Sequence, residues 1–297
     1  MCTTCGCSIG QTRINGKTIQ STHLEKPIQF RPLKHSNIRD HTPSLPIKNN
    51  RSSETLAFGT GLVTAHAPGM SQARMIKIER DILERNNQYA NENRRFLSEQ
   101  NILALNLLSS PGSGKTTLLV NTIEILRNKL PITVIEGDQQ TNHDAARIRE
   151  TGISATQINT GKGCHLDAFM VQQALQQISP QQNSVLFIEN VGNLVCPSNF
   201  DLGEAYKVVI LSVTEGEDKP LKYPDMFHVA DLLLLNKCDL LPYLSFDVDL
   251  AIEYAHRIHP GLPVIQISAM HGSGIQVWAD WIEANRLAIS STAQYQT

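Results

Sequence analysis

The chain has 297 residues, of which 41% are hydrophobic and 18% are charged, and its formal net charge at pH 7 is −2. This composition is typical of a globular protein with one large domain plus appendages, and the near-zero charge argues against nucleic acid as a partner. No apolar run approaches the roughly 18 residues of a membrane span. Because the N-terminus also lacks a hydrophobic signal region, we expect a cytoplasmic protein.

Half of the six cysteines, Cys2, Cys5 and Cys7, lie in the first seven residues beside the terminal amine. The Cys-x-x-Cys turn and Gly6 allow all three sulfurs to reach one ion. Thiolates and an amine suit Ni²⁺ or Zn²⁺, and the geometry that would separate these metals is not encoded in the sequence. The alternatives are adventitious metal binding and a redox pair, but the strand–helix junction that a redox pair requires is not predicted here. We therefore predict a metal-binding motif at residues 1–7, and the ligands alone leave Ni²⁺ and Zn²⁺ open.

Residues 8–70 are predicted to form a flexible linker, because scattered prolines and polar residues interrupt any hydrophobic period. Ser71 has the character of a helix N-cap. Apolar residues then recur at helical spacing to about Leu97, which predicts a helix that leads directly into an apolar strand at 102–108.

The stretch Ser109–Thr117, here called the phosphate loop, separates this strand from an amphipathic helix predicted at 116–127. A Gly-Lys-Thr sequence at a strand–helix junction is typical of loops that bind nucleotide phosphates through backbone N–H groups. Lys115 would contact the β- and γ-phosphates, and Thr116 would ligate Mg²⁺. Ser109 stands where the common pattern has its first glycine. The predicted nucleotide-binding residues of the loop are Gly112, Ser113, Gly114, Lys115, Thr116 and Thr117.

Strands and helices alternate after the phosphate loop, which predicts an α/β fold of the P-loop NTPase type. The sheet should be mainly parallel, with helices on both faces. Functional residues are expected at the carboxyl ends of its strands. The domain, with its leading helix, is predicted at 71–290 and a tail at 291–297. Strands are predicted at 132–135, 185–188, 207–213, 232–235 and 264–267, and helices at 166–178, 250–258 and 275–287.

Two acidic residues, Asp138 and Glu189, end predicted strands beside the phosphate loop. Either can hold Mg²⁺ directly or through water, and with Lys115 they are the predicted catalytic residues. No glutamine follows Glu189 to orient the attacking water, and Asn190 and Asn193 stand there instead. Hydrolysis is therefore expected to be slow, or to depend on a partner or a dimer.

A base-recognition element, Asn236, Lys237 and Asp239, follows a short apolar strand. The Asp carboxylate can accept two hydrogen bonds, from N1–H and the 2-amino group of guanine, and adenine offers neither donor. The asparagine would hold the loop while the lysine stem packs on the base. Ser268 and Ala269 follow the next strand, where a backbone N–H can reach guanine O6. These residues predict GTP as the substrate.

A second group of possible metal ligands is formed by Cys164 and His165, which precede a helix, and Cys196, which lies beyond the Glu189 strand. Both segments leave the same edge of the predicted sheet, so the three side chains can converge on one ion. A fourth position would remain for water or a residue of another subunit. A buried cysteine with a surface histidine is the alternative.

These motifs together resemble those of the hydrogenase nickel-incorporation GTPase family. The likeness covers the extreme N-terminus and residues 71–290, and the substitution at Ser109 is typical of the family's loop. The motifs that carry it are Cys-x-x-Cys-Gly-Cys, Ser-Ser-Pro-Gly-Ser-Gly-Lys-Thr-Thr, Glu-Gly-Asp-Gln-Gln-Thr, Gly-Cys-His-Leu, Glu-Asn-Val-Gly-Asn-Leu-Val-Cys-Pro and Asn-Lys-x-Asp.

The resemblance implies a cytosolic maturation factor that delivers Ni²⁺ to the large subunit of [NiFe]-hydrogenase. The N-terminal cysteines match the family's high-affinity nickel motif, and Cys164, His165 and Cys196 match a weaker nickel or zinc site. The family dimerises on binding GTP and works with a small zinc-containing nickel metallochaperone and the hydrogenase large subunit precursor. The absence of a His-rich tract after the N-terminus argues against bulk nickel storage.

Three other functions are alternatives. A urease nickel-insertion GTPase is disfavoured by the N-terminal cysteine motif and the long linker. A nickel buffer whose nucleotide only sets the oligomeric state is separated from an enzyme by measuring turnover. A P-loop kinase is disfavoured by Asn236, Lys237 and Asp239, and a preference for ATP would restore it.

Overall fold

The computed structural model describes residues 13–14, 17–18, 72–138, 143–161 and 163–294. The predicted metal motif at 1–7 and most of the predicted linker at 8–70 lie outside these residues. Among the helices described, none combines the length and the apolar character that a membrane crossing requires.

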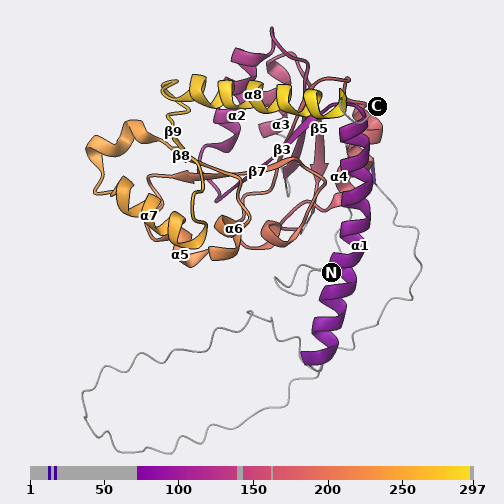
Figure 1. The fold of residues 1–297 in the computed structure, drawn as a ribbon, viewed down its shortest axis with the longest axis horizontal. Coiled ribbons are helices and arrows are strands. Elements are labelled where there is room, and N and C mark those ends of the chain that lie inside the picture. The colour runs from indigo at the N-terminus through magenta and orange to yellow at the C-terminus, as the bar shows by residue number, and fades with distance from the viewer. Residues whose placement is uncertain (1–12, 15–16, 19–71, 139–142, 162, 295–297) are drawn as a thin grey trace, which may run out of the picture. The chain divides into compact units, whose positions relative to one another are not determined.

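Seven parallel strands form the centre of the fold, in the order β5-β4-β6-β3-β7-β8-β9 (Figure 1). The predicted α/β class with a mainly parallel sheet is therefore confirmed. The strands are β3 (Leu103–Ser109), β4 (Ile132–Asp138), β5 (Ser154–Asn159), β6 (Val185–Glu189), β7 (Tyr206–Ser212), β8 (Leu232–Asn236) and β9 (Val264–Gln266).

Two short strands within the predicted linker extend the sheet at β5. They are β1 (Arg13–Ile14) and β2 (Lys17–Thr18), which pair antiparallel, and β1 also pairs antiparallel with β5. The described part of the predicted linker therefore belongs to the sheet.

Helices cover both faces of the sheet (Figure 1). The side chains of β3 show the division, because Leu103, Leu105 and Leu107 pack with α2, α3 and α8, whereas Ala104 packs with α1 and α4. Leu108, on the same face as Ala104, packs with α6 and α7. The helices are α1 (Gln72–Glu99), α2 (Lys115–Leu126), α3 (His143–Glu150), α4 (Ala168–Ile178), α5 (Lys219–Lys222), α6 (Pro224–His228), α7 (Val248–Ile258) and α8 (Ile275–Gln294), with 3₁₀ helices η1 (Cys196–Asn199) and η2 (Cys238–Tyr243).

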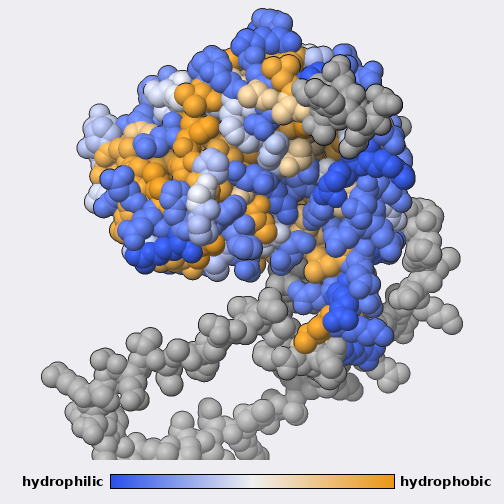
Figure 2. Space-filling model, in the orientation of Figure 1, coloured by the Kyte–Doolittle hydropathy of each residue, from blue (hydrophilic) through white to orange (hydrophobic). Residues whose placement is uncertain are grey.

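The helix that opens the described domain, α1, is fixed by buried asparagines. The Nδ2 of Asn93 donates to the carbonyl of Ala168 at 2.8 Å and to that of Leu202 at 3.0 Å. The backbone at Gly203 must also lie close to α1, because a Cβ on Gly203, whose φ is +91°, would lie 2.6 Å from the carbonyl oxygen of Ala90. The outer side of α1 seen in Figure 2 is mostly hydrophilic, so the helix buries one face and exposes the other.

On the other face, α8 packs against α2, the helix that follows the phosphate loop. Trp278 of α8 is 1% exposed, and its indole N–H donates to Oγ1 of Thr122 in α2 at 3.0 Å. Trp281 stacks on Trp278, with ring centroids 5.4 Å apart. The middle of α2 is thus supported from behind by a stacked aromatic pair, of which Trp278 is buried and Trp281 is partly buried.

Several elements differ from the predictions. The helix α3 and the strand β5 were not predicted, and α8 continues to Gln294, so the tail predicted at 291–297 begins later. The helix α4 starts at Ala168 rather than Leu166, because the carboxylate of Asp167 accepts a hydrogen bond from the N–H of Met170 at 2.8 Å and caps it.

Candidate nucleotide site and metal site

The phosphate loop depends on glycine for its shape. Gly112 has a φ of +76° and Gly114 a φ of +92°, and both values lie in the left-handed region that favours glycine. A Cβ on Gly114 would also lie 2.6 Å from Nδ2 of Asn236. A side chain at Gly114 would therefore break the contact between the phosphate loop and the base-recognition element.

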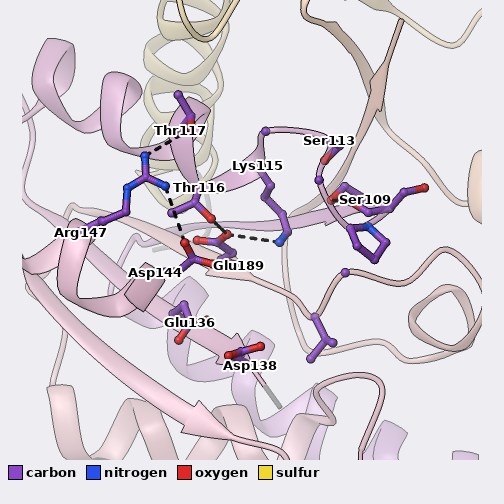
Figure 3. Close-up of a pocket in the computed structure, with 17 residues that line it drawn as sticks. Ser109, Ser113, Lys115, Thr116, Thr117, Glu136, Asp138, Asp144, Arg147 and Glu189 are labelled. Atoms are coloured by element: carbon purple, nitrogen blue, oxygen red, sulfur yellow. Dashed lines mark hydrogen bonds and ion pairs between the residues drawn. The ribbon is translucent and has the colours of Figure 1, made fainter. Parts of the chain in front are cut away.

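A cavity of about 470 Å³ opens beside the phosphate loop. Its walls are the loop itself, the carboxyl ends of β4 and β6, and α3 (Figure 3). Mixed charges line it, which suits a phosphate chain together with a cation. The ionisable lining residues are Lys115, Glu136, Asp138, Asp144, Arg147 and Glu189.

Three of the predicted residues meet at the centre of this cavity (Figure 3). One oxygen of Glu189, Oε1, accepts a hydrogen bond from Thr116 Oγ1 at 2.7 Å and lies 3.2 Å from Lys115 Nζ. Its other oxygen, Oε2, is buried without a hydrogen-bond partner among the described residues. A hydroxyl and a carboxylate with a spare oxygen are suitable ligands for Mg²⁺, and Asp138 lines the same cavity from the end of β4.

Glu136 was not predicted, although it also lines the cavity. It is 2% exposed, and its pKa is raised from 4.5 to about 8, chiefly by burial and then by the charges of Glu189 and Asp138. Its Oε2 has no hydrogen-bond partner among the described residues. Its position two residues before Asp138 on one strand places both on the same face, and this spacing is the signal that would have revealed it.

Asp144 and Arg147 of α3 line the cavity as well and were not predicted. Arg147 Nη2 donates to Oγ1 of Thr117 at 3.3 Å, and Arg147 Nη1 lies 3.7 Å from Asp144 Oδ1. The arginine therefore stands at the first turn of α2, where it adds positive charge to the cavity.

The base-recognition element is joined directly to the phosphate loop. Asn236 Nδ2 donates to the carbonyl of Ser113 at 2.8 Å, and Lys237 Nζ donates to the carbonyl of Gly112 at 2.7 Å. Asn236 Oδ1 in turn accepts a hydrogen bond from the N–H of Ala269 at 3.0 Å. One buried asparagine thus links the carboxyl ends of β3, β8 and β9.

Asp239 lies beside the residues that follow β9. Its Oδ1 accepts a hydrogen bond from Ser268 Oγ at 2.5 Å, and its Oδ2 lies 3.6 Å from His271 Nε2. The predicted base-binding residues therefore lie together, although they are not part of the cavity lining. The structure places them next to the phosphate loop, as recognition of a base beyond the phosphates requires.

The predicted ligands Cys164, His165 and Cys196 also lie together and are here called the inner metal site. Their ligand atoms are all within 4.8 Å of one another, and His165 and Cys196 are buried. The ring of His165 packs on Phe200, with ring centroids 4.0 Å apart, which restricts its orientation. Two sulfurs and an imidazole are suitable ligands for Ni²⁺ or Zn²⁺.

Comparison with known proteins identifies one family and a set of similar relatives within it. Residues 103–266 match the family described as CobW/HypB/UreG, nucleotide-binding domain. The hydrogenase maturation factor HypB of Azotobacter vinelandii is 56% identical over 286 residues, covering 96% of this chain and 93% of that protein. The HypB of Escherichia coli strain K12 is 51% identical over 295 residues, covering 97% of this chain and 100% of that protein.

Solved structures agree. HypB from Archaeoglobus fulgidus has a TM-score of 0.64 and 41% identity, covering 68% of this chain and 99% of that chain. HypB from Helicobacter pylori in complex with nickel has a TM-score of 0.64 and 38% identity, covering 69% of this chain and 96% of that chain. The chain therefore belongs to the HypB hydrogenase maturation factors, within the CobW/HypB/UreG family of nucleotide-binding proteins.

Proposed function

We propose that this protein is a GTPase that couples GTP hydrolysis to the delivery of nickel into the large subunit of [NiFe]-hydrogenase. One observation carries the proposal. Glu189, which contacts Lys115 and Thr116 in the phosphate cavity, and Cys196 of the inner metal site lie at the two ends of one short segment. A change at the nucleotide phosphates therefore has a direct path to a metal ligand.

The side chains in the cavity have separate tasks in this reaction. Lys115 exchanges its contact with Glu189 for the β- and γ-phosphate oxygens of GTP. Thr116, Glu189 and Asp138 hold Mg²⁺, which neutralises charge on the phosphates when bound. Asn190 and Asn193 do not take the place of a water-orienting glutamine, because their amides bind backbone groups. We infer that hydrolysis is slow, because no side chain orients the attacking water and catalysis rests on positioning and charge alone.

The choice of guanine rests on the base-recognition element. The Asp239 carboxylate accepts two hydrogen bonds from the base once its contacts with Ser268 and His271 give way. The backbone N–H groups that follow β9 are then available to guanine O6. Adenine has no pair of donors to match this carboxylate, so GTP is the proposed substrate.

Nickel is the proposed cargo, and the nickel complex of the Helicobacter pylori HypB supports this choice. We propose that Cys2, Cys5 and Cys7 bind Ni²⁺ tightly and that the inner metal site binds Ni²⁺ or Zn²⁺ more weakly. The proposed partners are a second copy of the chain, which binds when GTP is present, a small zinc-containing nickel metallochaperone and the hydrogenase large subunit precursor.

The Lys115→Ala variant tests the coupling. We expect GTP turnover and nickel transfer to the precursor to fall together by at least about 100-fold, because the lysine contributes to transition-state charge stabilisation. The matched control is Lys129→Ala, which removes an exposed lysine paired with Glu283 and should leave both rates unchanged. Nickel transfer that persists in Lys115→Ala without turnover would instead identify a nickel buffer.

A further inference from the structure

Two asparagines hold the backbone on either side of His165. Asn193 Nδ2 donates to the carbonyl oxygen of Cys164 at 3.1 Å. Asn190 Oδ1 accepts a hydrogen bond from the N–H of Leu166 at 3.1 Å. The position of two inner-site ligands therefore depends on side chains from the segment that follows β6.

Both asparagines are also fixed within their own segment. Asn193 Oδ1 accepts a hydrogen bond from the N–H of Val195 at 2.9 Å, and Asn190 Oδ1 accepts a second one from the N–H of Val191 at 2.9 Å. Each amide thus bridges two stretches of backbone, so a shift in one stretch is passed to the other.

A buried network supports Asn190 from behind. Its Nδ2 donates to Oδ1 of Asn106 at 3.3 Å, and Asn106 donates to Oε1 of Glu204 at 3.0 Å. Asn190 is 1% exposed and Asn106 is fully buried in the central strand β3. Losing a partner inside such a network is costly, so Asn190 is strongly held in one orientation.

The other side of the same segment rests on the phosphate loop. The N–H of Asn190 donates to the carbonyl of Leu107 in β3 at 3.1 Å. A Cβ on Gly192 would lie 3.1 Å from Cα and N of Pro111, so this glycine lies directly against the loop. Residues 189–196 therefore contact the nucleotide site on one side and the inner metal site on the other.

We propose that Asn190 and Asn193 form an asparagine clamp that transmits the nucleotide state to the inner metal site. When bound phosphates displace residues 191–193, Asn193 moves Cys164 while Asn190 stays fixed to β3, so Cys164 shifts relative to His165 and the metal affinity changes. This inference rests on the proposed function, because it names the residues that couple its two sites. Asn190 and Asn193 are positioning residues and touch neither the reacting phosphate nor the metal.

The test measures coupling rather than affinity. The protein used is the full chain carrying Cys2→Ser, Cys5→Ser and Cys7→Ser. Its Ni²⁺ dissociation constant is measured with GDP and again with a non-hydrolysable GTP analogue. The ratio of these two dissociation constants reports the coupling. Coupling between sites typically produces a ratio of about 5 to 150.

The informative variant is Asn193→Asp, which keeps the oxygen that accepts from Val195 and loses the N–H that donates to Cys164. We expect its ratio to fall to within about twofold of one, while GDP affinity stays at the parent value. The added negative charge strengthens Ni²⁺ binding with either nucleotide and therefore cancels in the ratio. Asn193→Ala, which adds no charge, should give the same loss.

Asn285→Asp is the matched control, because it removes a similar side-chain donor, the 2.8 Å bond to the carbonyl of Trp281 in α8, and adds the same charge. Its ratio should equal that of the parent. A parental ratio in both Asn193 variants overturns the clamp and leaves the proposed function standing. A ratio of one in the parent overturns both the clamp and the proposed function. Reciprocity provides a second readout, since Ni²⁺ must change the nucleotide affinity by the same factor.

Discussion

Glu136 illustrates how a residue's role can depend on neighbours that are distant in sequence. Sequence reasoning selected Asp138 because it ends a strand, and passed over the glutamate two positions earlier. Glu189 of the adjacent strand β6 lies opposite Glu136 in the strand register, and burial with this neighbour raises the pKa of Glu136 to about 8. Neither the register nor the burial was available before the fold.

Glu136→Gln should remove a pH-dependent cost of folding. Above pH ~4.5 the carboxyl group of the unfolded chain loses its proton, whereas that of the folded chain, with a pKa of about 8, keeps it. The stability that this group contributes is therefore fully present below pH ~4.5 and is lost as the pH rises through about 8. We expect the variant to gain unfolding free energy over the parent between pH 5 and pH 9. Urea denaturation of nucleotide-free, metal-free protein measures it, with exposed Glu150→Gln as the control. A difference that is constant with pH contradicts the prediction.

Asp239→Asn should change which base is preferred. An amide offers one acceptor and one donor, so it loses one hydrogen bond to guanine and matches the 2-oxo group of xanthine. We expect GTP affinity to fall about 10- to 100-fold, the cost of a hydrogen bond to a charged group, and xanthosine triphosphate affinity to rise. Competitive binding of the two nucleotides measures this, with the exposed Asp225→Asn as the control. Unchanged preference for GTP would disprove this role of Asp239.

Among the elements, those with long apolar runs were predicted and those with few apolar residues were missed. The strands β3, β6 and β8 are buried throughout, so their sequences are almost uninterrupted apolar runs. The strand β5 has only Ala155 and Ile158 as apolar residues, and α3 buries only Ala145 and Ile148. Eight residues with two buried positions are too short for helical periodicity to be recognised.

Asn93→Ala should loosen α1 from the rest of the domain. The substitution removes the hydrogen bonds that Asn93 donates to two buried carbonyls, those of Ala168 and Leu202, which costs about 2–3 kcal/mol of unfolding free energy. Asn91→Ala, two residues away on the exposed side of the helix, should change stability by less than about 0.5 kcal/mol. Urea denaturation compares the pair, and equal stabilities would show that Asn93 does not anchor the helix.

For the whole molecule, the sequence predicted which segments carry chemistry but not the contacts between them. The rule that functional residues gather at the carboxyl ends of parallel strands placed the phosphate loop, the base-recognition element and the inner metal site on one edge, and the structure brings each group together there. It could not reveal that Asn236 ties the loop to the base-recognition element, or that Asn193 reaches Cys164. Such contacts depend on side-chain directions that only the packed fold determines.

Removing the N-terminal thiols should separate two classes of nickel site in the full chain. With Cys2, Cys5 and Cys7 changed to serine, we expect tight Ni²⁺ binding to disappear and a weaker site to remain, because thiolates are the preferred soft ligands. A competitive Ni²⁺ titration measures both affinities. Cys238→Ser, a cysteine in the base-recognition element, serves as the control and should keep the tight site. Equal tight binding in the parent and the triple variant would assign that site to other residues.

The stacked pair of Trp278 and Trp281 is an intrinsic fluorescence probe. They are the chain's two tryptophans, and both lie on α8. Trp278 is hydrogen-bonded to Thr122 of α2, two turns after the residues that would hold the phosphates. Intrinsic fluorescence therefore originates from a single helix that rests on the nucleotide-binding one. We therefore expect nucleotide binding and release to change the fluorescence of the unlabelled protein, so that both can be followed in real time without a dye near any of its cysteines.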